Sequence, residues 1–528
     1  MSPSEEATGT LSPQEERFER YRKLAGVVLA PLAFLFAFHL ARHLPPEGRR
    51  LSGILAFTAV LWVCEVLPLP VTALLGAALC VILGVAPAKQ VLAYFADPIV
   101  FVFIGGFMLA RAMTVHGLDR RIALSFLSVP FFNASPGRML AGLGIVTGLL
   151  SMWISNTATT AMMLPIALGI LAALHEARVR AGVATGPIDA RRWPFATGMM
   201  LMVAYAASLG GIGTPVGSPP NLIGVAQIRE ATGRTISFLE WMAVCVPIML
   251  VAGAALIAIL RWLHPAPNDP LKMSEDRGDR SSMRTFVREQ RNGLGAWTRG
   301  QRGTLIAFLV AVTLWILPGV LQVISSISGS AVLAPMQKWF EQRLPEGVVA
   351  ILAAMLLFAL PTDLRRGRFV LSWPDAVRID WGTILLFGGG LALGGLMFTT
   401  GVARALGEGL TATLGVESLW MLTGLSIVIA IVMSEAASNT ASATMIIPVV
   451  IAIAQGAGVS AIPPALGACL GASYGFMLPV STPPNAIVYG SGLIPLPSMM
   501  RAGVLFDVVG FIIIWAGLRV LCPMLGLM

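Results

Sequence analysis

Charged residues are scarce in this sequence, making up 12% of its 528 positions, whereas hydrophobic residues make up 56%. Soluble chains carry about 25% charged residues, so a chain of this composition has too little polar surface to cover several soluble domains. The charges that are present gather in short stretches between apolar runs of 17 or more residues. The composition excludes a soluble protein and predicts an all-α polytopic membrane protein, with the lipid bilayer as its surroundings.

Cysteine is also scarce, and the five cysteines lie far apart inside apolar segments without CxxC or paired spacing. They predict neither a disulfide framework nor a metal site. The formal net charge is +9, but the basic residues stand in loops and form no stripe interleaved with aromatics. We therefore expect no nucleic-acid partner. No small-residue cleavage site follows the first apolar run, which favours a retained first helix over a signal peptide.

Hydropathy at about 20 residues per span predicts the membrane-crossing segments. In the first half these are 26–42, 51–68, 70–86, 98–115, a long tract at 138–175, a span at 195–228 interrupted at Gly213–Asn221, and 236–262. In the second half they are 303–322, 347–361, 383–400, a long tract at 418–455, a span at 464–492 interrupted at Leu478–Asn485, and 502–524. The predicted organisation is a tail (1–25), an extra first helix and loop (26–50), a first repeat (51–263), a polar cytoplasmic linker (264–302) and a second repeat (303–528).

The two halves are related in sequence. Residues 155–170 match residues 438–453 at 7 of 16 positions, and Pro219-Pro220-Asn221 recurs as Pro483-Pro484-Asn485. Each repeat thus has one long tract with a polar centre and one broken span. This arrangement is typical of transporters whose binding site lies at the interface between repeats.

The broken spans constrain the path of the chain. After Asn221 only about seven apolar residues remain, roughly 10 Å of helix, too little to recross the bilayer. The span at 195–228 is therefore one crossing with an unwound middle. The tract at 138–175 is either two spans or a re-entrant hairpin with its polar centre at the tip.

Basic residues predict the orientation, because positively charged loops stay in the cytoplasm. We expect the protein to lie in the cell (inner) membrane with its N-terminus in the cytoplasm. In this orientation the predicted outside loops 323–346 and 401–417 are close to neutral. Five crossings per repeat then make the second repeat inverted. Arg49 and Arg50 fall outside, against the rule. The basic residues placed inside are Arg111, Arg120, Arg121, Arg178, Arg180, Arg191, Arg192, Arg365, Arg366, Arg368 and those of the linker.

The triplets Ser155-Asn156-Thr157 and Ser438-Asn439-Thr440 lie in the middle of apolar tracts. Hydrocarbon supplies no hydrogen-bond partners, so unpaired polar groups there are costly. One interpretation is that the triplets only cap buried helices and help them pack. Their duplication at matched positions, each followed by a Pro-Pro-Asn break, favours the other interpretation, that they line a cavity.

The groups that would line such a cavity indicate which solutes it could bind. Four helix N-termini pointing at one spot favour a carboxylate or another anion. Asparagine oxygens and unwound carbonyls are ligands for Na⁺. No Lys, Arg or His lies within either triplet or either Pro-Pro-Asn loop, so bound cations would have to compensate the anion's charge. A rival class is an intramembrane enzyme, but neither triplet has a neighbouring His, Asp or Lys able to act as a general base.

Glu435 is an ionisable residue within an apolar tract and is a functional candidate for that reason. The alternative is a carboxylate that bonds to hairpin backbone and fixes the tip. Both interpretations stay open, since the matching position in the first half is Met152.

At these residues the sequence resembles the divalent anion sodium symporter family, which includes sodium-dependent dicarboxylate and citrate carriers. The resemblance spans roughly residues 50–525 and is carried by the two triplets, the loops Gly213–Asn221 and Leu478–Asn485, and the segment Phe103–Ala110. It implies eleven spans, two re-entrant hairpins, a homodimer built on a scaffold domain, and an elevator-like movement of the transport domain.

The resemblance also implies site residues. Those that would contact the substrate carboxylates are Ser155, Asn156, Thr157, Ser218, Pro219, Ser438, Asn439, Thr440, Thr482 and Pro483. One Na⁺ would lie among Ser151, Ser155, Asn156 and Gly217, and a second among Ser434, Ala437, Asn439 and Ser481, partly through backbone oxygens.

We therefore expect Na⁺-coupled symport of C4 dicarboxylates such as succinate, malate or fumarate, with Na⁺ as coupling ion, no other cofactor and no enzymatic activity. The alternatives are a sodium-independent dicarboxylate exchanger, or a carrier of citrate or sulfate.

Overall fold

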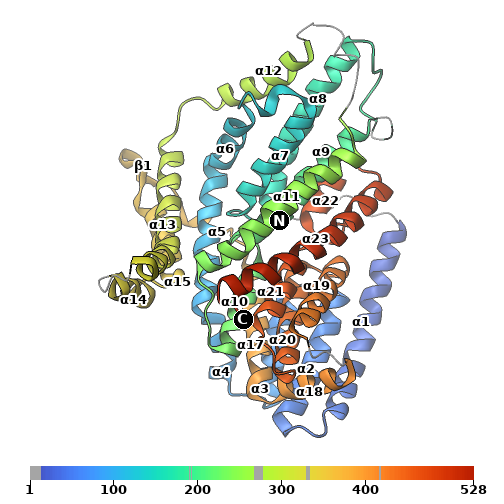
Figure 1. Cartoon of the computed structure of the whole chain (residues 1–528), viewed down its shortest axis with the longest axis vertical. Helices are drawn as coiled ribbons and strands as arrows, with labels where there is room; N and C mark the ends of the chain where they lie inside the picture. The colour runs from blue at the N-terminus through green and yellow to red at the C-terminus, as the bar shows by residue number, and fades with distance from the viewer. Residues whose placement is uncertain (1–12, 190, 192, 267–277, 329–332, 415–417) are drawn as a thin grey trace.

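The chain folds into an elongated assembly of helices (Figure 1). The structure, a computed structural model, describes residues 13–189, 191, 193–266, 278–328, 333–414 and 418–528. The helices of the first half are α1 (Pro13–Leu40), α2 (Pro46–Val63), α3 (Leu69–Ile82), α4 (Ala88–Ala93), η1 (Tyr94–Ala96), α5 (Pro98–His116), α6 (Leu118–Leu127), η2 (Phe132–Ala134), α7 (Pro136–Ser151), α8 (Asn156–Arg180), α9 (Pro194–Gly210), η3 (Gly211–Gly213), α10 (Pro219–Thr232) and α11 (Phe238–Leu263).

The second half has the same long elements in the same order. After α12 (Gly278–Gly293) come α13 (Arg299–Ser328), α14 (Leu333–Arg343), α15 (Glu346–Ala359), β1 (Pro361–Asp363), η5 (Leu364–Arg366), β2 (Arg368–Phe369), α16 (Trp373–Ala376), α17 (Trp381–Thr399), α18 (Val402–Leu414), α19 (Leu419–Ala436), α20 (Asn439–Gly456), α21 (Ile462–Gly471), α22 (Pro483–Tyr489) and α23 (Leu496–Met524). The strands β1 and β2 form one small antiparallel pair.

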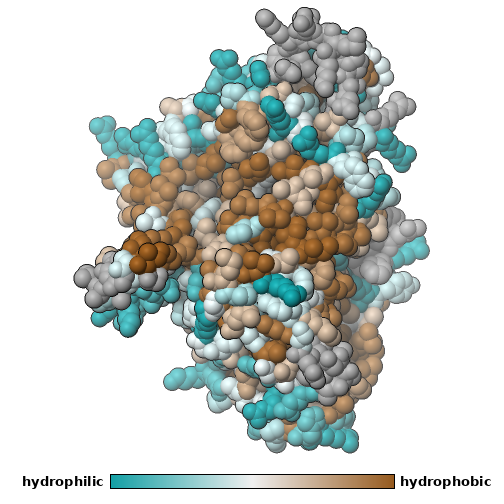
Figure 2. Space-filling model, in the orientation of Figure 1, coloured by the Kyte–Doolittle hydropathy of each residue, from teal (hydrophilic) through white to brown (hydrophobic). Residues whose placement is uncertain are grey.

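The helices are long and apolar enough for a membrane protein. Ten helices of the described residues could each cross a bilayer, or up to eleven if the bent pair Pro335–Arg343 and Glu346–Ala359 counts as one span. Hydrophobic residues predominate over the middle of the face in Figure 2, and hydrophilic residues gather toward its upper and lower ends. The predicted all-α polytopic fold with about eleven spans is confirmed.

Corresponding helices of the two halves pack in corresponding ways. Helix α7 packs on α9 as α19 packs on α21, and α5 packs on α15 as α17 packs on α3. Helices α11 and α23, which correspond to each other, also pack together. The sequence relationship between the halves is thus accompanied by matching helix neighbours.

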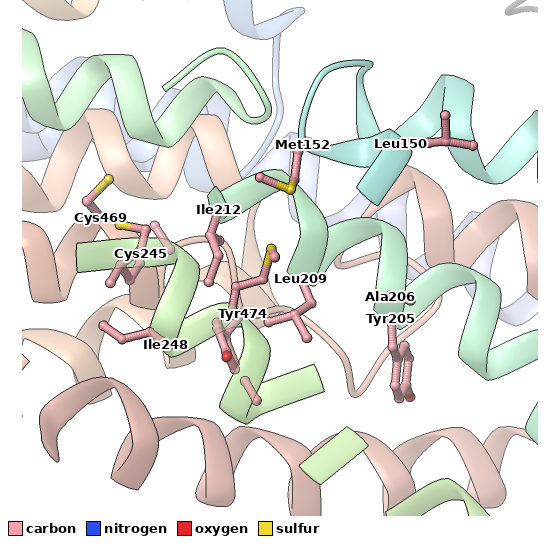
Figure 3. Close-up of a cluster of buried hydrophobic side chains, with 14 of the residues drawn as sticks. Leu150, Met152, Tyr205, Ala206, Leu209, Ile212, Cys245, Ile248, Cys469 and Tyr474 are labelled. Carbon is pink, nitrogen blue, oxygen red and sulfur yellow. The ribbon is translucent and has the colours of Figure 1, made fainter. Parts of the chain in front are cut away.

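Close helix packing depends on glycine at the α7–α9 contact. A Cβ atom added to Gly210 would lie 2.2 Å from the carbonyl oxygen of Gly148. The buried cluster around this contact contains Leu209, Ile212 and Tyr474, which are drawn with their neighbours in Figure 3. The end of α9, the η3 segment that follows it and the unwound segment after α21 therefore share one core.

The breaks differ in detail from the predicted interruptions. Both Pro-Pro-Asn sequences open a helix, because proline suits the first helical turn, where its missing N–H removes no hydrogen bond. The non-helical segment in the first half is therefore 214–218. In the second half it runs over 472–482 and begins six residues before the predicted Leu478.

Several segments between the predicted spans are also helical. Within the predicted linker, α12 packs against α8 and α6, with Met283 and Val287 buried. Helices α14 and α18 lie within the loops predicted outside, and α1 begins inside the predicted tail. The parts of the tail, linker and outside loops at 1–12, 267–277, 329–332 and 415–417, together with Arg192, lie outside the described residues.

Candidate functional site

One cavity of about 640 Å³ lies where the two triplets meet the two Pro-Pro-Asn loops. Its lining includes all ten residues that the sequence predicts for substrate contact: Ser155, Asn156, Thr157, Ser218, Pro219, Ser438, Asn439, Thr440, Thr482 and Pro483. Residues as far apart in the chain as Ser155 and Pro483 thus line one space. The volume falls within the range of about 300–1,000 Å³ that is usual for small-molecule sites.

The triplets lie at helix starts that face this cavity. Ser155 precedes α8, and its hydroxyl accepts a hydrogen bond from the Ala158 N–H at 3.3 Å. Ser438 precedes α20 and accepts from the Ala441 N–H in the same way, at 3.2 Å. The serines therefore cap their helices, as one interpretation predicted. They also line the cavity, so helix capping alone does not describe their position.

The Pro-Pro-Asn asparagines hold the unwound segments in shape. The Asn221 Nδ2 group donates to the carbonyl oxygens of Gly211 and Thr214, at 2.8 Å and 2.7 Å. The Asn485 Nδ2 group donates to the carbonyls of Gly475 and Leu478, both at 3.0 Å. In both halves one buried carboxamide thus ties a helix start to the carbonyls of the preceding break.

Oxygen atoms gather around Gly217 in the first half. Ser151 Oγ donates to Asn156 Oδ1 at 2.8 Å. A Cβ atom added at Gly217 would lie 2.5 Å from the carbonyl oxygen of Gly211 and 2.8 Å from that of Met152. Two carbonyl oxygens therefore flank Gly217, and Asn156 with its Ser151 partner belongs to the same region. Oxygen-rich surroundings of this kind suit Na⁺.

The second half has a related cluster. Ser434 Oγ lies 2.7 Å from Asn439 Oδ1 and 2.8 Å from the carbonyl oxygen of Ala472. A Cβ atom added at Gly475 would lie 3.1 Å from both oxygens of Ser434. Ser481 is buried beside this group. Ala437 follows directly after α19 and offers only backbone atoms.

The Glu435 carboxylate fixes the unwound segment between α21 and α22. Its Oε1 atom accepts hydrogen bonds from the N–H groups of Phe476 and Met477, at 2.5 Å and 2.8 Å. Its Oε2 atom accepts from Ser481 Oγ at 2.6 Å. Glu435 does not line the cavity. Of the two interpretations of this residue, the one in which it bonds to backbone near the tip describes these contacts.

The two oxygen clusters differ in their charged neighbours. The buried carboxyl of Asp507 on α23 lies near that of Glu435. No donor group of the described residues reaches either Asp507 oxygen. In the first half Met152 stands at the position that matches Glu435, and its side chain and that of Met249 both lie against Gly213. The second cluster therefore has two acidic neighbours, whereas the first has two thioethers.

Sequence reasoning missed Asp507, Arg111 and Arg378. Asp507 is an ionisable residue in an apolar tract, so the rule that singled out Glu435 could have found it. Arg111 was assigned to a cytoplasmic loop, but it lies on α5 and, like Arg378, lines the cavity. Only the packing of α5 against the rest of the chain reveals this position.

Comparison with known proteins places the chain among membrane transporters. A family model described as the sodium:sulfate symporter transmembrane region matches residues 20–528. The sodium-dependent dicarboxylate transporter SdcS of Staphylococcus saprophyticus is 31% identical over 505 residues, covering 95% of this chain and 92% of the relative. An uncharacterized transporter of Haemophilus influenzae is 35% identical over 486 residues, covering 92% of this chain and 94% of the relative.

A solved structure supports the fold independently. The YdaH transporter of Alcanivorax borkumensis superposes with a TM-score of 0.54 at 13% identity, covering 83% of this chain and 88% of that one. At this identity the likeness concerns the fold alone.

Proposed function

Because the chain belongs to the divalent anion sodium symporter family, we propose that it imports C4 dicarboxylates such as succinate, malate or fumarate together with Na⁺. Family membership makes it a multi-pass membrane transporter and not an enzyme. The observation that carries the proposal is the single cavity lined by both triplets and both Pro-Pro-Asn loops.

The lining suits a doubly charged anion. The starts of α8, α10, α20 and α22 all contribute to it, so helix N-termini with their positive dipole ends surround one space. The hydroxyl and amide groups of Ser155, Asn156 and Thr157, and of their counterparts in the second half, can donate hydrogen bonds to carboxylates. These ten residues form the proposed substrate site.

Two Na⁺ ions would supply the missing positive charge at the helix tips. We place one in the cluster of Ser151, Ser155, Asn156 and Gly217, and the other in the cluster of Ser434, Ala437, Asn439 and Ser481. Since the Ser481 hydroxyl donates to Glu435, this residue would bind Na⁺ through its remaining lone pair or its backbone. The Glu435 carboxylate beside the second cluster favours tighter cation binding there than in the first.

The matching helix neighbours support a transporter built from two inverted repeats. On the distribution of basic residues, we place it in the cell (inner) membrane with its N-terminus in the cytoplasm. Arg378 and Asp380 line the cavity and are exposed, so we take the part of the cavity beside them as its mouth. On the charge rule this mouth faces the cytoplasm. Elevator-like movement of the hairpins in a homodimer would carry the substrate to the other side.

Two alternatives remain within transport, a sodium-independent dicarboxylate exchanger and a carrier of citrate or sulfate. Uptake of labelled succinate into proteoliposomes, with Na⁺ or choline outside, separates symport from exchange. We expect uptake that requires Na⁺, and counterflow indifferent to Na⁺ would reject symport. A thermal-shift series with succinate, citrate and sulfate, each with and without Na⁺, identifies the anion, since a ligand of the folded state raises its apparent stability.

A further inference from the structure

The cavity lining contains positively charged side chains as well as the uncharged polar groups of the helix starts. The helix starts provide only hydroxyls, amides and backbone groups, whereas α5 and the exposed segment after α16 contribute Arg111 and Arg378 to the same lining. These two are the only basic side chains among the described residues of the lining. A four-carbon anion is small compared with 640 Å³, so it need not contact the helix starts and the arginines at the same time.

The Arg111 guanidinium is poorly satisfied where it lies. Its nearest acidic partner is Asp375, with an N···O distance of 3.6 Å, which is longer than a hydrogen bond. The Asp375 carboxylate instead accepts from Ser372 Oγ at 2.6 Å. The Nε atom of Arg111 is buried, and no acceptor of the described residues reaches it. A buried donor without an acceptor is costly, and a carboxylate entering the cavity would supply one.

The other charged groups of the mouth leave room for an anion. Arg378 is exposed, follows α16, and makes no side-chain ion pair within the described part of the chain. Asp380 is the one acidic residue of the described lining. Its carboxylate caps α17, accepting from the N–H of Thr383 at 3.0 Å and from its hydroxyl at 2.6 Å. Among the described lining residues, two arginines thus face one carboxylate, whose oxygens are already engaged by Thr383.

We propose that Arg111 and Arg378 form a second anion-binding station, separate from the site at the helix tips. This station holds a carboxylate of the dicarboxylate at the cavity mouth, between the helix tips and the surrounding water. The planar guanidinium of Arg111 can donate two parallel hydrogen bonds to one carboxylate, and Arg378 adds a second positive charge on the path. The inference rests on the proposed dicarboxylate transport.

The station increases the rate at which the anion enters the cavity, because positively charged walls raise the local concentration of an anionic solute. Among the described residues, no hydrogen bond or ion pair links either arginine to the proposed Na⁺ clusters, so we expect the Na⁺ dependence to be set by the helix tips. Removing the station should therefore change the apparent affinity for the dicarboxylate and its dependence on ionic strength. The Na⁺ concentration for half-maximal uptake should stay the same.

The test compares Arg111→Gln, Arg111→Lys and Arg378→Gln with the control Arg365→Gln in proteoliposomes. Arg365 is an exposed arginine of the neighbouring η5 segment that does not line the cavity. We expect the KM for succinate to rise about tenfold in Arg111→Gln and severalfold in Arg378→Gln, with a weaker dependence on added salt. Arg111→Lys should recover part of the loss, and Arg365→Gln should behave as wild type.

Wild-type uptake separates the two possible failures. If the wild-type protein shows no Na⁺-driven dicarboxylate uptake, the proposed function fails. If it does, and both Gln variants keep the KM and salt dependence of Arg365→Gln, the second station is refuted. Thermal unfolding in detergent identifies a variant that does not fold. Arg378 is exposed, so its variant decides the question even if Arg111→Gln is unstable.

Discussion

Replacing Glu435 by glutamine tests how the second oxygen cluster is held in shape. The Glu435 carboxylate accepts three hydrogen bonds, from Phe476 N, Met477 N and Ser481 Oγ. Hydrogen bonds to a charged group contribute about 1.5–3 kcal/mol each, compared with about 0.5–1.5 kcal/mol for neutral pairs. Glutamine keeps the shape but loses the charge, so the three bonds together should weaken by about 3 kcal/mol.

That loss falls on the segment carrying Ser481 and Thr482, which belongs to the second oxygen cluster, the proposed Na⁺ site, and to the cavity lining. If all of it appeared in Na⁺ binding, the affinity would fall roughly hundredfold, since about 1.4 kcal/mol corresponds to a factor of ten. We expect the Na⁺ concentration for half-maximal succinate uptake to rise by about ten- to a hundredfold in Glu435→Gln. Thermal stabilisation by Na⁺ over choline, measured on the same purified variant, should weaken in parallel.

The control is Met152→Leu, which changes the corresponding position of the first half without removing a hydrogen-bonding side chain. Its Na⁺ dependence should stay within about twofold of wild type, because volume-conserving apolar exchanges are well tolerated. A Glu435→Gln protein that keeps both the wild-type Na⁺ dependence and the wild-type melting temperature would show that these three bonds do not shape the cation cluster.

Three further changes test other parts of the structure. Asn485→Ala removes two hydrogen bonds to loop carbonyls and should destabilise the protein by roughly 2–4 kcal/mol; unchanged thermal unfolding would contradict this role. Gly210→Ala places a Cβ atom 2.2 Å from the Gly148 carbonyl oxygen and should cost about 1–3 kcal/mol, whereas Gly253→Ala, whose nearest neighbour is at 3.8 Å, should be neutral in the same melting assay. Burial lowers the pKa of His264, just beyond the end of α11, from 6.5 to about 4, so the unfolded chain binds the proton more readily than the folded one. Stability should therefore be full above about pH 6.5 and fall by up to about 3 kcal/mol as the pH drops toward about 4. Thermal unfolding of His264→Asn should lack this component, and an equal pH dependence in the variant would count against it.

The sequence by itself determined the membrane-spanning character, the doubled architecture and the polar positions within it. These features are readable because a helix in hydrocarbon satisfies its backbone within its own segment, so a long apolar run predicts a span without reference to the rest of the chain. Ser155 and Ser438 stand out for the same reason, since polar groups in such a run need an explanation.

Tertiary structure decided which of those positions meet. Glu435 finds its partners Phe476, Met477 and Ser481 more than 40 residues further along the chain, and no local pattern marks them as a group. Arg111 looks like an ordinary basic residue at a span end until α5 is packed against its neighbours. Side-chain partners in a bundle depend on how separate helices are rotated and stacked against one another, and that arrangement is fixed by packing across the whole molecule.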